Sequence, residues 1–297
     1  MSETRVLDVD EQGRLLIAVS DADHTRLVEV DAEDGRRELA GVPGFASARY
    51  LPGERKAVVQ HGAPAQLSLL RVGGKLTHLV GADDHDTELL GVLPGRVVYR
   101  TNRKHRLLYS VVIRNVLVGE EQAVYDRGGA VVAAAVSPNS RYIAIRLPRK
   151  LVLVDTMPVT EDDHVRLISP EPATRGRADL SWLPDSSRLV ATEYDADSAR
   201  VVRFDVTSAS WHPAIVSLDP SARSWTAPDG RRTAVATGSE LAFYQADNGR
   251  HLRAADLDGA ITDFRWSPDS LTLAVNTTAG IAVVAADTAA VRQVTVH

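Results

Sequence analysis

One short pattern recurs along almost the whole chain at a nearly constant interval. Its clearest copies place Pro before Asp or Asn and then Ser or Gly, at 137–141, 183–186, 227–231 and 267–270. Weaker copies lie at 51–55 and 93–96, and in the first copy, at 11–14, Glu11 replaces the proline. Positions 11, 52, 94, 138, 184, 228 and 268 are separated by 41, 42, 44, 46, 44 and 40 residues. A period of roughly 40–50 residues built from short strands is typical of β-propeller blades.

Each repeat reads as four short strands separated by turns. In the best-marked repeat, we expect strands over 177–183, 188–194, 199–206 and 211–218. The second strands are apolar and β-rich, whereas the third strands alternate between polar and apolar residues. Such alternation indicates a strand with one buried face and one wetter face. The sequence therefore predicts an all-β fold, a seven-bladed β-propeller of four-stranded antiparallel blades.

The order of strands at the two ends predicts how the ring closes. The chain opens on a first strand, expected at 5–9, and closes on a fourth strand, expected at 291–296. Each blade is then complete within its own segment, so we expect closure by packing, without a strand latch. We expect a single propeller domain over 1–297, with blades at approximately 4–43, 44–83, 86–126, 130–171, 176–219, 221–257 and 259–297.

The repeated turn and the strand before it have separate physical roles. Pro sets φ at the first central position of the turn, and we expect the Asp, Asn or Gly that follows to adopt its tight conformation. Two residues before the Pro position, most copies carry an apolar residue, including Trp182 and Trp266. Large apolar residues at equivalent strand positions usually pack in a core. We therefore expect both tryptophans between blades, not on a ligand.

Composition narrows the class of function. The formal net charge is −5, and no run of Lys and Arg is long enough to form a basic face, so we expect no binding of nucleic acid. The chain has no cysteine, which excludes disulfides, thiolate metal sites and a cysteine nucleophile. No apolar run approaches the roughly 20 residues that span a bilayer, and the N-terminus lacks the apolar region of a signal peptide. We expect a soluble cytoplasmic protein without membrane contact.

Several motifs resemble a known family. Segments 99–103, 124–129 and 137–144, together with the Trp-containing repeats at 182–186 and 266–270, are similar to the non-catalytic propeller of the prolyl oligopeptidase family. TolB-like and WD-repeat-like propellers carry related motifs. The resemblance covers essentially all of the chain. It implies a seven-bladed, unlatched propeller that caps a C-terminal α/β-hydrolase domain and filters access to it.

The chain departs from this family plan at the catalytic residues. It has no Gly-x-Ser-x-Gly nucleophile elbow, and none of the family's catalytic residues has a matching position. Peptidase activity is therefore not expected, and no other catalytic motif specifies an enzyme. We expect either a stand-alone relative or the propeller of a larger protein, and we expect no cofactor.

The loops around the channel mouth carry the candidate site residues. Loops between second and third strands and loops between blades emerge on one face of a propeller, where binding residues usually lie. Four of the candidates for a ligand pocket are His61, His85, Arg103 and His105, and Asp195 is a further candidate. The acidic stretch 83–88 matches no calcium loop, and consecutive acids are usually solvated or paired, so no metal site is predicted.

These observations leave three hypotheses for function. The first is a non-catalytic propeller that presents its loop face or channel mouth to a protein or peptide partner. The second is an isomerase, lyase or cyclase that acts on a small molecule in the channel through acid–base residues at its mouth. The third is the gating propeller of a split or truncated serine peptidase. Whether the protein is an enzyme is left open by the sequence.

Overall fold

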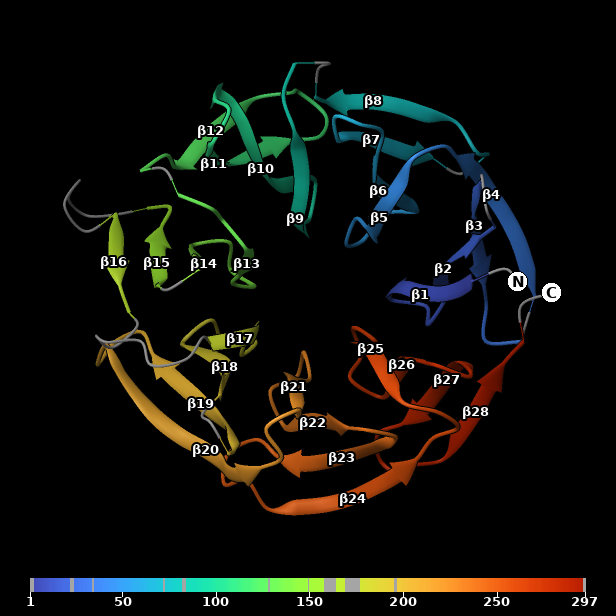
Figure 1. The fold of residues 1–297 in the computed structure, drawn as a ribbon, viewed down its shortest axis with the longest axis vertical. Helices are drawn as coiled ribbons and strands as arrows, with labels where there is room; N and C mark the ends of the chain where they lie inside the picture. Colours follow the sequence, from blue (N-terminus) through green and yellow to red (C-terminus); the bar gives the residue numbers. More distant parts are fainter. Residues whose placement is uncertain are drawn as a thin grey trace.

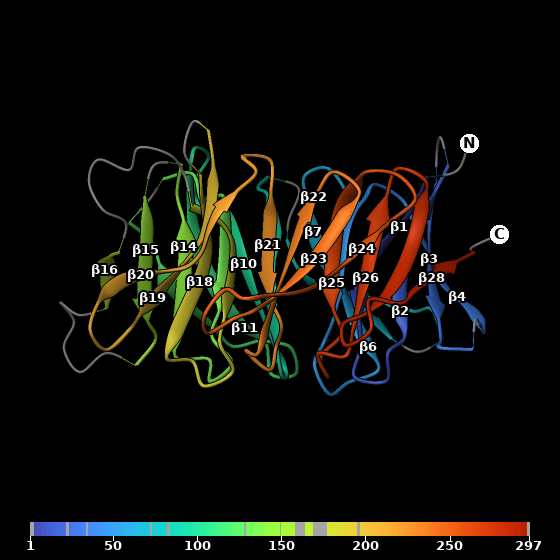
Figure 2. The same ribbon diagram turned by 90° about the horizontal axis from the view of Figure 1, so that it is seen from below.

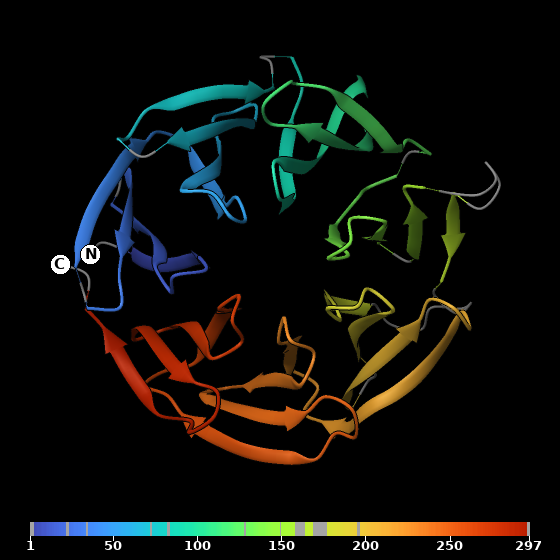
Figure 3. The same ribbon diagram turned by 180° about the vertical axis from the view of Figure 1, so that it is seen from behind.

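Seven four-stranded antiparallel sheets form a ring, and the predicted β-propeller is confirmed. The computed structural model describes residues 3–295, except 22–23, 34, 72, 82–83, 128, 149, 158–163, 169–176 and 195–196. The strands of each sheet follow one another in sequence and pair only with their neighbours in that order. Figure 1 shows the sheets arranged as blades around a common centre, and Figure 3 shows the same ring from behind.

The strands of the blades have the following bounds. Blades 1 to 3 contain β1 (Glu3–Val9), β2 (Leu15–Ser20), β3 (Thr25–Val30) and β4 (Arg36–Val42); β5 (Phe45–Tyr50), β6 (Lys56–His61), β7 (Gln66–Arg71) and β8 (Leu76–Val80); and β9 (Thr87–Leu93), β10 (Arg96–His105), β11 (Leu108–Asn115) and β12 (Glu121–Tyr125). Blades 4 and 5 contain β13 (Ala133–Val136), β14 (Tyr142–Arg146), β15 (Leu151–Asp155) and β16 (Val165–Leu167); and β17 (Arg177–Trp182), β18 (Arg188–Tyr194), β19 (Ala199–Asp205) and β20 (Ser210–Leu218). Blades 6 and 7 contain β21 (Arg223–Thr226), β22 (Arg232–Thr237), β23 (Glu240–Gln245) and β24 (His251–Asp256); and β25 (Ile261–Trp266), β26 (Thr272–Thr277), β27 (Gly280–Ala285) and β28 (Val291–Val294).

The first strand of every blade lies nearest the centre, and the fourth lies at the rim. Figure 1 shows β1, β5, β9, β13, β17, β21 and β25 surrounding the centre of the ring. Seen from the side, in Figure 2, the ring is a thick disc, and the innermost strands run from one of its faces toward the other. Residues at the start of a first strand and at the end of a second strand therefore lie toward the same face.

The core lies between neighbouring blades, as expected for stacked sheets. One apolar cluster joins blades 6 and 7 through Phe243 and Trp266, and another joins blades 4 and 5 through Trp182. Trp182 and Trp266 are only 6% and 7% exposed, which confirms their predicted role. Each also donates its indole N–H to a backbone carbonyl of the preceding blade, at Ala135 (3.0 Å) and Trp225 (2.9 Å). The indole rings thus link blades by hydrogen bonds as well as by packing.

The ring closes between blades 7 and 1 without a shared strand, as the sequence predicts. The side chain of Asn276, on β26, lies against β1: the amide of Val6 donates to Oδ1 at 2.7 Å, and Nδ2 donates to the carbonyl of Val6 at 2.9 Å. Apolar residues of both blades pack in one cluster behind this pair. At the rim, Arg36 donates to the carbonyl of Thr295 at 2.6 Å. We call this boundary between blades 7 and 1 the seam.

The repeated turn works differently from the prediction in one respect. In the Pro-Asp copies, the positive φ falls one residue later than expected, for example at Ser186 (60°) and Ser270 (63°). The Asp itself accepts a hydrogen bond through its side chain, as Asp269 does from the amide of Leu271 at 2.9 Å. Asp therefore stabilises the turn by bonding the backbone two residues on. The Ser270 hydroxyl oxygen in turn accepts from the amide of Asp229, which links blade 7 to blade 6.

Candidate functional site

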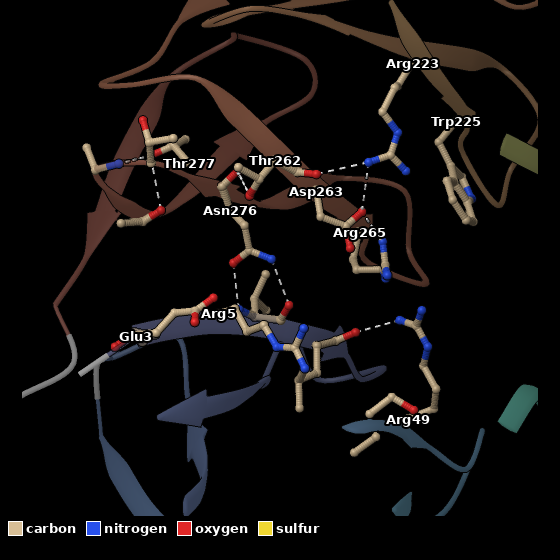
Figure 4. A pocket seen from close by; sticks show the side chains of 18 of the residues that line it. Glu3, Arg5, Arg49, Arg223, Trp225, Thr262, Asp263, Arg265, Asn276 and Thr277 are labelled. Atoms are coloured by element: carbon tan, nitrogen blue, oxygen red, sulfur yellow. Dashed lines mark hydrogen bonds and ion pairs between the residues drawn. The ribbon is translucent and has the colours of Figure 1, made fainter. Parts of the chain in front are cut away.

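A cavity of about 870 Å³ opens at the mouth of the channel and lies across the seam. Its walls come from the innermost strands β1, β5, β21 and β25 and from the hairpin at Thr277–Gly280 between β26 and β27. Because the hairpin joins a second to a third strand, the cavity lies on the face where the loops between blades also emerge. This is the face that the sequence indicates for binding. Figure 4 shows the lining side chains.

Four arginines line this cavity, one from each of blades 1, 2, 6 and 7. They are Arg5, Arg49, Arg223 and Arg265. The acidic residues among the described lining are Glu3 and Asp263, and that part of the lining contains neither His nor Lys. The lining thus has four positive groups and two negative ones, in a protein whose net charge is −5. We call the four side chains the arginine cluster.

Breaks in the pairing of the innermost strands explain why arginines occupy these positions. The register of β1 shifts between Val6 and Asp8, that of β5 between Phe45 and Ser47, and that of β25 between Ile261 and Asp263. A β-bulge leaves its extra residue unpaired and re-aims nearby side chains. The carbonyl of such an extra residue is then open to a donor from outside its own sheet.

Arginines of neighbouring blades supply these donors. Arg5 donates to the carbonyl of Ala46 at 2.8 Å, Arg49 to that of Leu7 at 2.5 Å, and Arg223 to that of Thr262 at 3.0 Å. Each accepting residue is the extra residue of a bulge. A guanidinium has five N–H donors in a fixed fork, so these contacts leave most of its donors for other acceptors.

On the blade 6 and 7 side of the cavity, Asp263 connects two arginines. Its Oδ1 accepts from Nη1 of Arg265 at 2.7 Å and lies 3.8 Å from Nη1 of Arg223. The guanidinium of Arg265 also lies over the ring of Trp225, 5.6 Å from its centroid, an arrangement that favours a cation. The Nε atom of Arg265 is buried and has no hydrogen-bond partner among the described residues. Arg265 is therefore well held but incompletely satisfied.

On the blade 1 and 2 side, the positive charge of Arg49 is only weakly compensated. Burial lowers the pKa of Arg49, and the charge of Arg265 lowers it further. The carboxylate of Asp8 lies 3.9 Å away and opposes this shift. Burial in turn raises the pKa of Asp8, despite Arg49 and the hydrogen bond from the amide of Tyr50. The guanidinium groups of Arg49 and Arg265 thus face the same cavity, each with one carboxylate beside it: Asp8 at 3.9 Å from Arg49 and Asp263 at 2.7 Å from Arg265.

Asp179 holds Arg223 from behind. Asp179 lies where the pairing of β17 is irregular, and its φ of 51° is unusual for a residue other than glycine. Its side chain is 8% exposed and accepts from the hydroxyl of Tyr194 at 3.1 Å and from Nη2 of Arg223 at 3.3 Å. Strained backbone with satisfied side-chain contacts is common beside binding sites. Here it fixes the direction of one arginine.

The predicted site residues lie outside the described lining of this cavity. The ring of His61, at the end of β6, is 2.9 Å from the hydroxyl of Ser68, and burial lowers its pKa, helped by His78. His85 pairs with Asp84 at 2.7 Å. Asp195 lies outside the residues that the structure describes.

Arg103 and His105 lie at the end of β10, next to the turn that leads to β11. Arg103 pairs with Glu121 at 2.6 Å, and the Nδ1 atom of His105 accepts from the amide of Leu107 at 3.2 Å. Their roles as ligand-binding residues stay a prediction.

Hydrogen bonds do bring the loops that carry these candidates together. Asp86, next to His85, accepts from the amide of Ala65 at 3.1 Å, and its own amide donates to the side chain of Asn102 at 2.8 Å. The loop after β6, the connector before β9 and the β10–β11 hairpin are thus one hydrogen-bonded unit on the loop face of blades 2 and 3. It is a separate feature from the cavity.

Two kinds of feature are absent from the described residues. In the part of the chain that the structure describes, no three His, Cys, Asp or Glu side chains gather in a way that would hold a metal ion. The same residues include no helix that is long and apolar enough to cross a lipid bilayer.

The arginine cluster was missed by sequence reasoning, although the sequence carries a signal for it. The position three before each Pro is occupied, in blades 6, 7, 1 and 2, by Trp225, Arg265, Asp8 and Arg49. In the remaining blades it is occupied by Gly or by another small residue. Charged residues at one register position of the innermost strands, confined to adjacent blades, indicate a polar side of the channel. A comparison of the copies position by position would have found it.

Comparison with known proteins shows similarity of fold. No protein-family model and no curated protein matches the sequence. Among solved structures, an oligogalacturonate lyase in complex with manganese is 12% identical with a TM-score of 0.75, over 93% of this chain and 87% of that one. A prolyl endopeptidase is 12% identical with a TM-score of 0.72, over 98% of this chain and 49% of that one. The chain has the propeller fold of these proteins.

The predicted resemblance is thereby confirmed at the level of the fold. This chain spans about half of the prolyl endopeptidase. An oligogalacturonate lyase from Vibrio parahaemolyticus is also similar, with a TM-score of 0.71 and 12% identity over 94% of this chain and 87% of that one. Enzymes are therefore among the proteins with this fold, and fold alone does not decide between catalysis and binding.

Proposed function

We propose that this protein is a binding propeller that takes a peptide segment of a partner protein into the mouth of its channel. The observation that carries this proposal is the cavity of about 870 Å³ across the seam, with four arginine side chains converging on it. The side chains stand on the innermost strands of a closed ring, and such a rigid scaffold loses little conformational entropy when a ligand binds.

The mixed character of the lining favours a peptide. The arginine cluster offers free N–H donors, whereas Glu3 and Asp263 offer acceptors and negative charge. Thr277 and Thr278 add hydroxyl groups. A peptide has backbone donors and acceptors at every residue and carries charge only at chosen positions. A peptide therefore matches a surface with both positive and negative groups better than does a polymer that carries a negative charge on every unit.

Binding of peptides at the cavity provides the test. A fluorescently labelled library of short random peptides is screened by anisotropy, and the best binders are measured by calorimetry on the wild-type protein and on Ala279→Trp. Ala279 is an exposed lining residue, so the larger ring narrows the cavity while all four arginines stay in place. We expect the substitution to weaken binding at least tenfold. Arg253→Ala, at an exposed position of the outer strand β24, is the matched control and leaves binding unchanged.

A second candidate function uses the same cavity for catalysis on an acidic small molecule. Two observations favour it: the arginine cluster suits carboxylates, and oligogalacturonate lyases have a similar fold. Asp263 and Glu3 are the acid–base groups in the described lining. The test is incubation with oligogalacturonate, with and without divalent metal ions, followed by ultraviolet absorbance of an unsaturated product. Turnover by the wild type that is lost in Ala279→Trp supports this candidate function. No turnover, either with or without metal ions, rules it out.

A further inference from the structure

The arginine cluster has more hydrogen-bonding capacity than the protein uses. Among the described residues, Arg5 and Arg49 each make one hydrogen bond, to a bulge carbonyl, so most of their donors are available. Arg265 uses Nη1, while its buried Nε has no partner among the described residues. The acceptor that best fits a guanidinium fork is a carboxylate.

Electrostatics leads to the same ligand group. The charge of Arg265 lowers the pKa of Arg49, so the two guanidinium groups repel each other across the cavity. Asp263 neutralises the Arg265 side at 2.7 Å, but Asp8 approaches Arg49 only to 3.9 Å. An anion placed between Arg49 and Arg265 would relieve this repulsion in a partly desolvated site, where charge interactions are stronger than in water. The site is therefore poised for a negative group.

The position of the cluster relative to the seam adds a requirement. Arg5 and Arg49 belong to blades 1 and 2, whereas Arg223 and Arg265 belong to blades 6 and 7. The seam between these pairs lacks a shared strand and is held near the cavity by the side chain of Asn276 on Val6. A ligand with two anionic groups can contact both sides at once. Such a ligand would link the first and last blades. Because it binds only when the seam is closed, it would stabilise the closed ring.

We propose that the ligand is an acidic peptide whose carboxylates bridge the seam, with one on Arg5 and Arg49 and another on Arg223 and Arg265. This inference rests on the proposed function, and it adds the chemical class of the peptide and the consequence for ring closure. Asp179 acts as a positioning residue, because it fixes Arg223 through Nη2. The bound peptide takes the place of the strand latch that this ring lacks.

The experiment compares peptides that contain two glutamates at varied spacing with matched peptides that contain two glutamines. Binding is measured by calorimetry, and thermal unfolding is followed with and without peptide. We expect the glutamate peptides to bind at least tenfold more tightly, with affinity that falls as salt rises. Arg49→Gln and Arg265→Gln each weaken the glutamate peptide about tenfold and weaken the glutamine peptide by a smaller factor. Arg253→Ala again serves as the control.

Ring closure has its own readout. A ligand held on both sides of the seam must dissociate before the seam opens locally, whereas a ligand held on one side need not. At the same degree of saturation, we therefore expect hydrogen exchange at the amide of Val6 to slow more with a peptide of two glutamates than with a peptide of one glutamate. Equal protection of Val6 by the two peptides would overturn the bridging arrangement.

The outcomes separate this inference from the proposed function. If glutamine peptides bind as tightly as glutamate peptides and Ala279→Trp still abolishes binding, the acidic class is wrong and the proposed function stands. If no peptide binds, both are wrong. If oligogalacturonate binds through Arg49 and Arg265 but peptides do not, the carboxylate is recognised on a saccharide, and the peptide ligand is overturned.

Discussion

Replacement of Asn276 by alanine tests how an unlatched ring is held closed. The side chain of Asn276 bonds both the amide and the carbonyl of Val6, across the seam. Blade 6 has Ala236 and blade 5 has Thr192 at the corresponding strand position. In Asn276→Ala, the amide and the carbonyl of Val6 lose their partners across the seam. The seam then depends on apolar packing and on the contact at the rim.

The magnitude follows from the two groups left unsatisfied. A buried backbone group without a partner costs about 1–3 kcal/mol. Asn276 is 6% exposed, but it also lines the cavity, so water can reach part of the exposed backbone and lower the cost. We therefore expect the free energy of unfolding to fall by about 2–3 kcal/mol, a large share of the 5–15 kcal/mol typical of a domain.

Urea unfolding followed by tryptophan fluorescence measures this change. Asn248→Ala is the matched control, because Asn248 lies in an exposed turn and, among the residues described, accepts only a local hydrogen bond from the amide of Arg250. The control should stay within about 1 kcal/mol of the wild type. Hydrogen exchange at the amide of Val6 should accelerate in Asn276→Ala alone. A loss below about 0.5 kcal/mol with unchanged exchange would refute the role of Asn276 in closure.

Three further predictions concern a turn and two titrating groups. Ser270→Ala and Ser270→Gly both remove the hydrogen bond from the amide of Asp229, but only glycine adopts the φ of 63° without strain. Ser270→Ala should therefore destabilise the protein more than Ser270→Gly. Equal losses in thermal unfolding would contradict this. Burial and His78 lower the pKa of His61, so stability should decline as pH falls below about 6.5, and His61→Gln should flatten that decline in urea titrations at several pH values. Burial raises the pKa of Asp8, so ionisation of this carboxyl destabilises the fold as pH rises from about 3.9 through the raised value. Across that pH window, Asp8→Asn should gain stability relative to the wild type. Parallel pH profiles of the two proteins would show that the carboxyl is not desolvated.

The fold was predictable because its determinants are local and repeated. Each Pro-Asp turn marks a first and a second strand, and seven copies at a nearly fixed spacing leave one architecture. Trp182 and Trp266 were placed in the core for the same reason, since equivalent positions in a repeat have equivalent surroundings. The position of the positive φ was mistaken by one residue, because Asp acts through its side chain and leaves the tight conformation to the next residue.

The candidate site depends on residues that differ between the seven repeats, whereas the sequence analysis relied on the residues that the repeats share. Arg49 and Arg265 each lie beside a large buried residue on a first strand, where an alternating pattern alone indicates a wetter face. Their function in the channel follows from bulges that release the carbonyls of Leu7, Ala46 and Thr262, and bulges leave no clear mark in sequence. The loop histidines stand out in sequence because they are polar and clustered. The structure places them in a separate hydrogen-bonded unit, and their binding role stays a prediction.

The gating role, the cytoplasmic location and the absence of nucleic-acid binding also stay predictions. The similarity to a prolyl endopeptidase is a similarity of fold at 12% identity. A search for a hydrolase that copurifies with the protein addresses the gating role separately from the peptide measurements above.

A crystal structure of the protein with a doubly acidic peptide tests the central claim most directly. The account predicts peptide density in the cavity at the channel mouth, with one carboxylate on Arg49 and another on Arg265, and with the seam closed by Asn276 and Val6. Density for the peptide on the hydrogen-bonded loops of blades 2 and 3, with the cavity holding only solvent, would contradict it.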